Sequence, residues 1–303
     1  MGTRGTARGG WVLDGVPAAL RGPAGSEAPP GRAPQVACEE QKAPSLQADE
    51  SAWPVLVCLL GSFRVLRSGK AVTVRGAKAE SLLCHLALRP QHGAPRETLL
   101  CALWPNGDPG LAGQSLNSLV YSLHRTLGTG LEGAPPVVHE DGWYRLNTEA
   151  GVGVDAVWFD ALTAAGERRA RGGDHGAAAV YYRRAVRLFR GDLCAGNDAY
   201  AVVERERLRA RHLTLLARLA DRDFRAGDYG ACLEGAMRLL ALDPCREDAH
   251  RLVMRCYVRR GERAQAMRQF RACERILRSE FDAPPEAATL ALFELVRTTP
   301  EQV

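Results

Sequence analysis

The chain has 303 residues, a formal net charge of +5 and 46% hydrophobic residues, which suits about two globular domains. Residues 53–150 hold 9 Lys and Arg against 7 Asp and Glu, so this region is no electrostatic clamp for nucleic acid. No run approaches 18 apolar residues, and Asp14 and Gly15 interrupt the short apolar stretch near the N-terminus. The sequence therefore predicts a soluble, cytoplasmic protein with no membrane contact.

The nine cysteines favour free thiols over a disulfide framework. Their number is odd, and no two of them form a C-x-x-C pair. Several stand where an apolar residue would serve, such as Cys84 within Leu82–Leu86. We predict that most are buried, reduced thiols.

Residues 1–52 differ in composition from the rest of the chain. They hold 6 Pro and 8 Gly with little periodic apolar pattern, and such a segment cannot repay the entropy of ordering. We interpret them as a disordered leader or as an overextended start, with order beginning near Trp53.

Residues 53–150 alternate between strand and helix patterns. Apolar runs at 55–60, 63–66 and 71–74 predict two or three short antiparallel strands. Helical periodicity follows at 82–87, from Arg96 to 103, and from about 111 to Leu127, where Gly128 can end the third helix. Residues 137–139 and 143–146 flank an Asp-Gly turn and predict a β-hairpin. This order predicts an α+β winged helix-turn-helix domain.

Residues 151–303 are predicted to be all-helical and internally repeated. Turns at Gly227 and Gly261 lie 34 residues apart, and a similar turn at Gly173 precedes them. Thirty-four residues is the period of tetratricopeptide repeats, in which helix pairs stack to bury their apolar faces. We therefore predict a tetratricopeptide-like domain, with an irregular helical bundle as the alternative.

No motif supports an enzyme. Residues 128–133 match the dinucleotide fingerprint G-x-G-x-x-G, but a predicted helix precedes them and two prolines follow, whereas the fingerprint needs a strand before it and a helix after it. The sequence shows no Walker A motif, no zinc spacing of Cys and His, and no G-x-S-x-G. We predict a loop at 128–133, no cofactor, no metal and no catalytic residues.

The third predicted helix carries the candidate functional face. Its apolar stripe is Leu116, Val120, Leu123 and Leu127, and its opposite face is polar. Hydrogen-bonding side chains of graded length suit base edges and phosphates in the major groove, and the alternative is an ordinary solvated face. The candidate DNA-binding residues are Arg96, Gln114, Ser118, Tyr121, Ser122 and Arg125, together with Trp143 and Arg145 on the hairpin.

The sequence resembles the actinobacterial antibiotic regulatory protein (SARP) family over about residues 55–298. In the first half, the resemblance lies in the stretches 59–63, 82–88, 96–99, 103–105, 123–128 and 142–146. In the second half it lies in 154–159, 190–193, 204–208, 243–247 and 259–266. Ser122, His124 and Glu80 stand where basic residues are common in that family.

The resemblance implies an OmpR-like winged helix at 53–150 and a bacterial transcriptional activation domain (BTAD) at 151–303. It implies a nucleoid-associated activator that binds direct DNA repeats as two copies, near promoters of secondary-metabolite biosynthetic genes. It also implies that RNA polymerase holoenzyme is a partner.

Two other interpretations remain open. The weak basicity of 53–150 would suit a protein-interaction scaffold, in which the repeat domain binds partners and the winged helix has degenerated. An enzyme would need a site that the motifs do not reveal. We assign Arg205, Arg207, Arg209 and Arg211 collectively to solvent and partner contact, because alternate residues spread around a helix.

Overall fold

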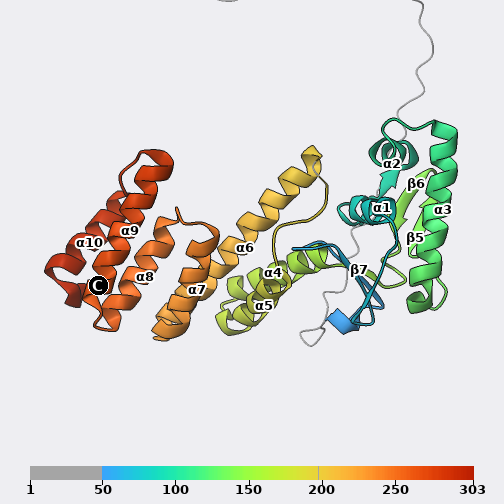
Figure 1. Cartoon of the computed structure of the whole chain (residues 1–303). Coiled ribbons are helices and arrows are strands. Elements are labelled where there is room, and N and C mark those ends of the chain that lie inside the picture. The colour runs from blue at the N-terminus through green and yellow to red at the C-terminus, as the bar shows by residue number, and fades with distance from the viewer. Residues whose placement is uncertain (1–49, 197) are drawn as a thin grey trace, which may run out of the picture. The chain divides into compact units, whose positions relative to one another are not determined.

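The computed structural model describes residues 50–196 and 198–303, in which an α/β region is followed by a helical region (Figure 1). Most of the predicted leader, residues 1–49, lies outside the described residues. Its last three residues form a 3-10 helix, η1 (Glu50–Ala52), and Glu50 pairs with Arg190 at 2.6 Å. Described structure therefore begins three residues before the predicted start at Trp53.

A four-stranded sheet opens the α/β region. Its strands are β1 (Val55–Cys58), β2 (Arg64–Arg67), β3 (Lys70–Val72) and β7 (Val152–Val154), in the order β3-β2-β1-β7. β1 pairs antiparallel with β2 and parallel with β7. All four residues of β1 are buried, which explains its unbroken apolar sequence. The prediction missed β7, which lies beyond the expected domain boundary at 150 and yet completes this sheet.

Three helices and a second sheet complete the α/β region. The helices are α1 (Ala77–Ala87), α2 (Arg96–Leu103) and α3 (Pro109–Leu127). The second sheet has the order β4-β6-β5, from β4 (Ala94–Pro95), β5 (Val137–Glu140) and β6 (Trp143–Leu146). The sequence predicts all of these except β4, whose residues lie in a predicted loop. Residues Gly128–Leu131, also predicted as loop, form the short 3-10 helix η2.

Local chemistry sets both ends of α3. The Asp108 side chain accepts a hydrogen bond from the Leu111 amide at 3.0 Å, and Pro109 occupies the first turn, where its missing N–H costs nothing. Leu116, Leu123 and Leu127 are buried, and Val120 is partly buried. The predicted apolar stripe therefore packs α3 onto the core and leaves its other side exposed.

The β5–β6 hairpin turns at Asp141-Gly142. Both residues have positive φ, 49° and 80°, as a type I′ turn requires. The Arg96 amide donates to the Gly142 carbonyl at 2.9 Å, so the turn is tied to the first residue of α2. This hydrogen bond is one of the contacts that position the hairpin.

The helical region consists of antiparallel helix pairs (Figure 1). Its helices are α4 (Asp155–Arg171), α5 (His175–Leu188), α6 (Ala199–Arg225), α7 (Tyr229–Leu242), α8 (Glu247–Arg259), α9 (Arg263–Phe281) and α10 (Ala287–Thr298), followed by η3 (Pro300–Gln302). The turn glycines Gly173, Gly227 and Gly261 have φ near +80°, a conformation that side chains disfavour. None of the described helices is long and apolar enough to cross a membrane.

Hydrogen bonds to backbone groups connect the α/β region and the helical region. The buried Asp155 carboxylate accepts from the Leu59 amide at 2.8 Å and from the Leu60 amide at 2.9 Å. Beside it, the Cys194 amide donates to the Leu59 carbonyl at 2.9 Å. Burial raises the pKa of Asp155 to about 6, although its hydrogen bonds to backbone amides act in the opposite direction. We call Asp155 with Leu59, Leu60 and Cys194 the junction.

The described cysteines are free thiols, and most of them are buried, as the sequence predicts. The buried set is Cys58, Cys84, Cys232, Cys256 and Cys273. Burial raises the pKa of Cys58 and of Cys84 to about 12, so these thiols stay protonated near neutral pH.

Candidate nucleic-acid interface

The polar face predicted on α3 is exposed along its whole length. The predicted residues on this face are all exposed: Gln114, Ser118, Tyr121, Ser122 and Arg125. Asn117 is exposed as well and fills the gap in a stripe at 114, 117, 118, 121, 122 and 125. This spacing follows one helix face. The prediction does not include Asn117, which lies at the edge of this face.

The stripe offers hydrogen-bonding groups that the fold leaves largely unused. Tyr121 is 67% exposed, so its ring and hydroxyl project from the helix. The Ser118 hydroxyl donates to the Gln114 carbonyl at 3.0 Å and keeps lone pairs that can accept another hydrogen bond. No ion pair holds Arg125 among the described residues, so its guanidinium is available to a phosphate or a base edge.

Arg96 lies between α3 and the hairpin. Its Nη1 donates to the Tyr144 hydroxyl at 3.1 Å and lies 3.5 Å from Oδ1 of Asn117. A Cβ on Gly113 would stand 2.4 Å from Nη2 of Arg96, so the glycine leaves the space that the guanidinium occupies. Arg96 is the first residue of α2, as predicted, and its side-chain hydrogen bonds connect α2 with α3 and β6.

The two hairpin candidates differ in their surroundings. Trp143 is 48% exposed on β6. Arg145 is partly buried and lies between two carboxylates, 3.3 Å from Glu140 and 3.7 Å from Glu149. Its charge is therefore largely balanced within the chain, whereas the Trp143 ring is free to make a contact.

Most cations of the α/β region make contacts within the protein. Arg67 donates to Thr129 Oγ1 at 2.6 Å, and Lys78 donates to the Leu103 carbonyl. The Arg89 guanidinium lies 4.0 Å from the centre of the Tyr200 ring. With Arg96 and Arg145, five of the nine cations between residues 53 and 150 are engaged in this way. Arg125 is the one Arg or Lys on α3.

The arginines of α6 have contacts within the chain, which corrects their assignment to solvent and partners. Arg205 donates to the carbonyls of Leu193, Ala195 and Gly196. Arg207 and Arg211 both pair with Asp160 of α4, and Arg211 lies 2.9 Å from it. Arg209 donates to the Leu242 carbonyl at 3.2 Å. These arginines hold the helical region together.

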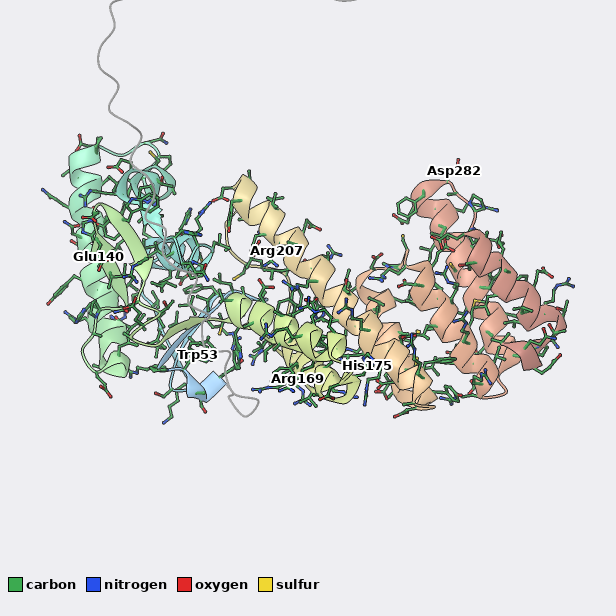
Figure 2. The ribbon with its side chains drawn as sticks, turned by 180° about the vertical axis from the view of Figure 1, so that it is seen from behind. Trp53, Glu140, Arg169, His175, Arg207 and Asp282 are labelled. Carbon is green, nitrogen blue, oxygen red and sulfur yellow. The ribbon has the colours of Figure 1, made fainter. Side chains whose placement is uncertain are left out.

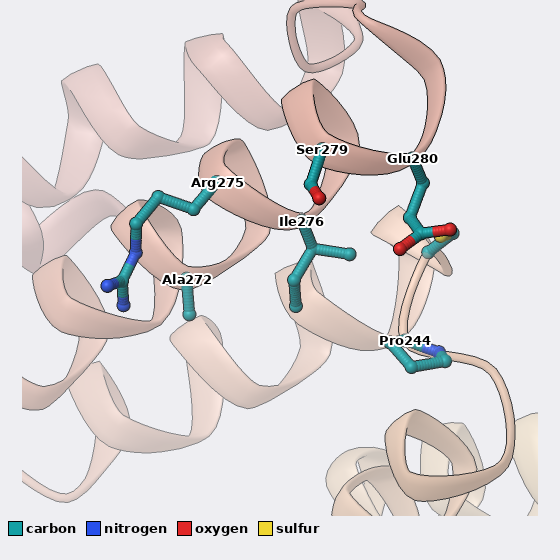
Figure 3. A pocket seen from close by; sticks show the side chains of 7 residues that line it. Pro244, Ala272, Arg275, Ile276, Ser279 and Glu280 are labelled. Atoms are coloured by element: carbon teal, nitrogen blue, oxygen red, sulfur yellow. The ribbon is translucent and has the colours of Figure 1, made fainter.

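A pocket in the helical region lies between the α7–α8 loop and α9 (Figure 3). Ala272, Ile276 and Pro244 give it an apolar lining, while Arg275 and Glu280 supply opposite charges. The remaining lining residues are Cys245 and Ser279. Within the described ranges, no group of three or more His, Cys, Asp or Glu could hold a metal ion.

Comparison with protein families matches residues 154–297 to the bacterial transcriptional activator domain. The match begins at the last residue of β7 and ends in α10. It therefore covers the helical region and leaves the α/β region outside.

Two regulatory proteins are similar over most of this chain. The regulatory protein AfsR of Streptomyces coelicolor is 29% identical over 248 residues, which cover 81% of this chain and 24% of AfsR. The regulatory protein DnrI of Streptomyces peucetius is 25% identical over 237 residues, covering 76% of this chain and 87% of DnrI. The chain thus spans about a quarter of the length of the AfsR proteins and most of the length of DnrI.

A solved structure has a similar fold. Mycobacterium tuberculosis EmbR, determined in complex with a low-affinity phosphopeptide, aligns with a TM-score of 0.64 and 21% identity. The alignment covers 81% of this chain and 65% of the EmbR chain. An α/β region followed by a helical region is therefore an arrangement found in a solved structure.

Proposed function

We propose that this SARP-family chain is a transcriptional activator whose α/β region is a winged helix that binds duplex DNA through α3. The observation that carries the proposal is the exposed stripe from Gln114 to Arg125, which lies opposite the buried leucines of α3. A helix of 19 residues with one polar face fits the major groove. The similarity to AfsR and DnrI, which are regulatory proteins by name, supports the same function.

The roles of the candidate residues follow from their exposure. Gln114, Asn117 and Ser118 offer donors and acceptors to base edges, while Tyr121 and Ser122 reach bases or phosphates. Arg125 supplies the charge on this helix. Arg96 positions the hairpin against α3, and Trp143 is the hairpin residue best placed to contact DNA.

The proposal includes how the protein would act at a promoter. One copy with few free cations should bind one site weakly at physiological salt. Two copies on a direct repeat of about one helical turn would lie on the same face of the duplex, and neighbouring copies would stabilise each other. The helical region, as a tetratricopeptide-like BTAD, would then contact RNA polymerase. The target genes would be biosynthetic.

The experiment compares Arg125→Ala with Lys70→Ala. Lys70 is an exposed cation on β3. We expect Arg125→Ala to weaken binding to a footprinted promoter duplex and to lower the log–log salt slope by about 1, while Lys70→Ala changes neither. Unfolding in urea should be unaltered in both variants.

A second variant separates binding from folding. Leu123 is 1% exposed, so Leu123→Ala should lower the free energy of unfolding by roughly 2–5 kcal/mol. If a correctly folded Arg125→Ala protein bound DNA like the wild type, α3 would not be the recognition helix. A wild-type protein that binds no duplex would favour the protein-interaction scaffold instead.

A further inference from the structure

The turn between α4 and α5 carries an arginine cluster that the fold does not neutralise. Arg168, Arg169 and Arg171 are exposed in the last turn of α4. Within the described part of the chain, no acidic side chain pairs with any of them. Figure 2 labels Arg169 and His175 at the same end of the α4–α5 pair. We call Arg168, Arg169 and Arg171 the arginine corner.

The acids near the arginine corner have other partners. Asp160 pairs with Arg207 and Arg211 of α6, and Glu167 lies 3.6 Å from Arg211 and 3.7 Å from Arg218. Asp174 accepts the Ala177 amide at 2.9 Å as the cap of α5. Local carboxylates are thus committed to α6 or to a helix cap, and the positive charge of the corner remains uncompensated.

The turn between α6 and α7 provides an internal comparison. Counting back four residues from the turn glycine gives Arg169 before Gly173 and Asp223 before Gly227. Asp223 lies 3.2 Å from Arg222 and 3.4 Å from Arg183.

The arginines of this second turn are all paired. Arg225, which matches Arg171, pairs with Asp221 at 2.8 Å. The helix dipole favours cations at the end of both α4 and α6, so it does not account for the difference. The position four residues before the turn glycine holds a carboxylate, Asp223, between α6 and α7, and an arginine, Arg169, between α4 and α5.

We infer that the arginine corner binds the phosphate backbone of the DNA that α3 reads. This inference rests on the proposed function and adds a second contact surface to it. α3 brings a single Arg or Lys, and five of the nine cations of the α/β region are engaged within the protein. The three unpaired guanidinium groups of the arginine corner supply the positive charge that the α/β region lacks. Their planar forks match phosphate oxygens.

The test measures DNA affinity of the full-length protein as a function of salt. The probe is a duplex of about 40 bp that contains the footprinted sequence and its flanks, long enough for backbone contacts beyond the recognised bases. The test variant is Arg168→Ala/Arg169→Ala/Arg171→Ala, and the matched control is Arg222→Ala/Arg225→Ala. A third variant replaces the corner arginines with lysine, and Arg169→Asp installs the residue found in the second turn.

The expected result is a lower salt slope for the alanine variant, by about one unit per arginine in contact. If all three arginines contact DNA, the ratio of the wild-type affinity to the affinity of the alanine variant should fall about 40-fold between 50 and 200 mM salt. The lysine variant should keep most of the slope, and the control should match the wild type. Arg169→Asp should weaken binding more than Arg169→Ala, because it adds a negative charge.

Other outcomes would overturn the inference. An alanine variant with wild-type affinity and salt slope would show that the corner does not contact DNA. Normal DNA binding with loss of activation in a purified transcription assay would assign the corner to a protein partner. If the wild type bound no duplex, the proposed function itself would fail. If Arg125→Ala lowered the salt slope and the variants of the arginine corner did not, the proposed function would stand and only the inference about the corner would fail.

Discussion

The two regions of this chain differ in how much positive charge they carry and in where unpaired cations remain. In the α/β region, cations tie the fold together: Arg96 connects α2, α3 and the hairpin, and Lys78 reaches the end of α2. The face of α3 is left with hydrogen-bonding groups and one arginine. In the helical region, arginines are abundant and those of α6 are held within the fold, as Arg207 and Arg211 are by Asp160. The number of Lys and Arg in a stretch of sequence therefore does not show which cations are unpaired, because that depends on the acidic and carbonyl groups that the fold brings beside them.

The regions differ less in packing than in charge. One hydrophobic cluster runs from β1 through α4, α5, α6 and α7 to α8, while a small separate cluster holds Met254, Ala266, Phe270, Leu292 and Val296. Leu59 and Leu60 of the junction belong to the large cluster. Stability should therefore be shared between the α/β region and the first helices, and the C-terminal helices should respond more independently.

The largest effect is expected from Phe159→Ala. Phe159 is fully buried in the large cluster, so truncation should lower the free energy of unfolding by about 3–5 kcal/mol. Amide exchange should increase in both regions. Phe293, partly buried against Phe270 in the small cluster, is the control, and Phe293→Ala should raise exchange in α9 and α10 only. Exchange confined to the helical region in Phe159→Ala would show that the two regions are stable separately.

A smaller loss is expected at the junction. Asp155→Ala leaves the Leu59 and Leu60 amides without their acceptor, and each buried donor costs about 1–3 kcal/mol. Removing the buried carboxylate also removes its own desolvation penalty, so we expect a total loss of roughly 2–4 kcal/mol in urea unfolding. Asp160→Ala is the matched control, because Asp160 is partly exposed and its surface ion pairs are worth about 0–1 kcal/mol. Equal losses in the two variants would contradict a structural role for the junction.

The pH dependence of the free energy of unfolding should show the effect of burying His212. Burial lowers the pKa of His212 to about 4 from its usual 6.5, and the ring stacks on Phe189 with centroids 4.1 Å apart. The folded pKa lies below the unfolded one, so this stability is present above pH 6.5 and is lost as the pH falls toward 4. The full difference is on the order of 3 kcal/mol.

The control for this prediction is His212→Gln, which cannot be charged. Unfolding should be followed at pH 7.5 and at pH 4.5 in both proteins. The wild type should lose more stability than the variant between these two values. An identical loss in both would mean that His212 is protonated in the folded protein without a penalty.

The sequence predicts the elements whose signals are local. The apolar stripe of α3 and the Asp141-Gly142 turn each lie within one short stretch, and both are found where expected. β7 and β4 have three and two residues, and neither follows its partner strand through a short turn as β3 follows β2. Each exists because of a distant partner: β7 pairs with β1 and β4 with β6. Such pairing is a tertiary property.

The candidate site divides in the same way. Periodicity alone places the predicted residues of α3 on an exposed face. It cannot show that Arg145 lies between Glu140 and Glu149, or that Arg205 donates to the carbonyl groups of a distant loop. A sequence pattern places a side chain on a face, and only the fold decides whether another chain segment reaches it first.

The smallest effect is expected from Gly113→Ala, which tests how Arg96 acts. The new Cβ would displace the Arg96 guanidinium, since the two would stand 2.4 Å apart. Alanine raises helix propensity by up to about 1 kcal/mol, and loss of the hydrogen bond to the Tyr144 hydroxyl costs about 0.5–1.5 kcal/mol. The free energy of unfolding should therefore change by no more than about 1 kcal/mol.

DNA binding should respond more clearly than stability does. A hairpin that is no longer tied to α3 presents Trp143 less firmly, so we expect binding to weaken a few-fold, while the salt slope stays unchanged. Ser115→Ala, an exposed position on the same helix, is the control. A lower salt slope in Gly113→Ala would mean that Arg96 itself contacts a phosphate in the wild type. Unchanged binding would mean that neither the guanidinium nor the tie it makes contributes, and the interface would then be confined to the stripe on α3.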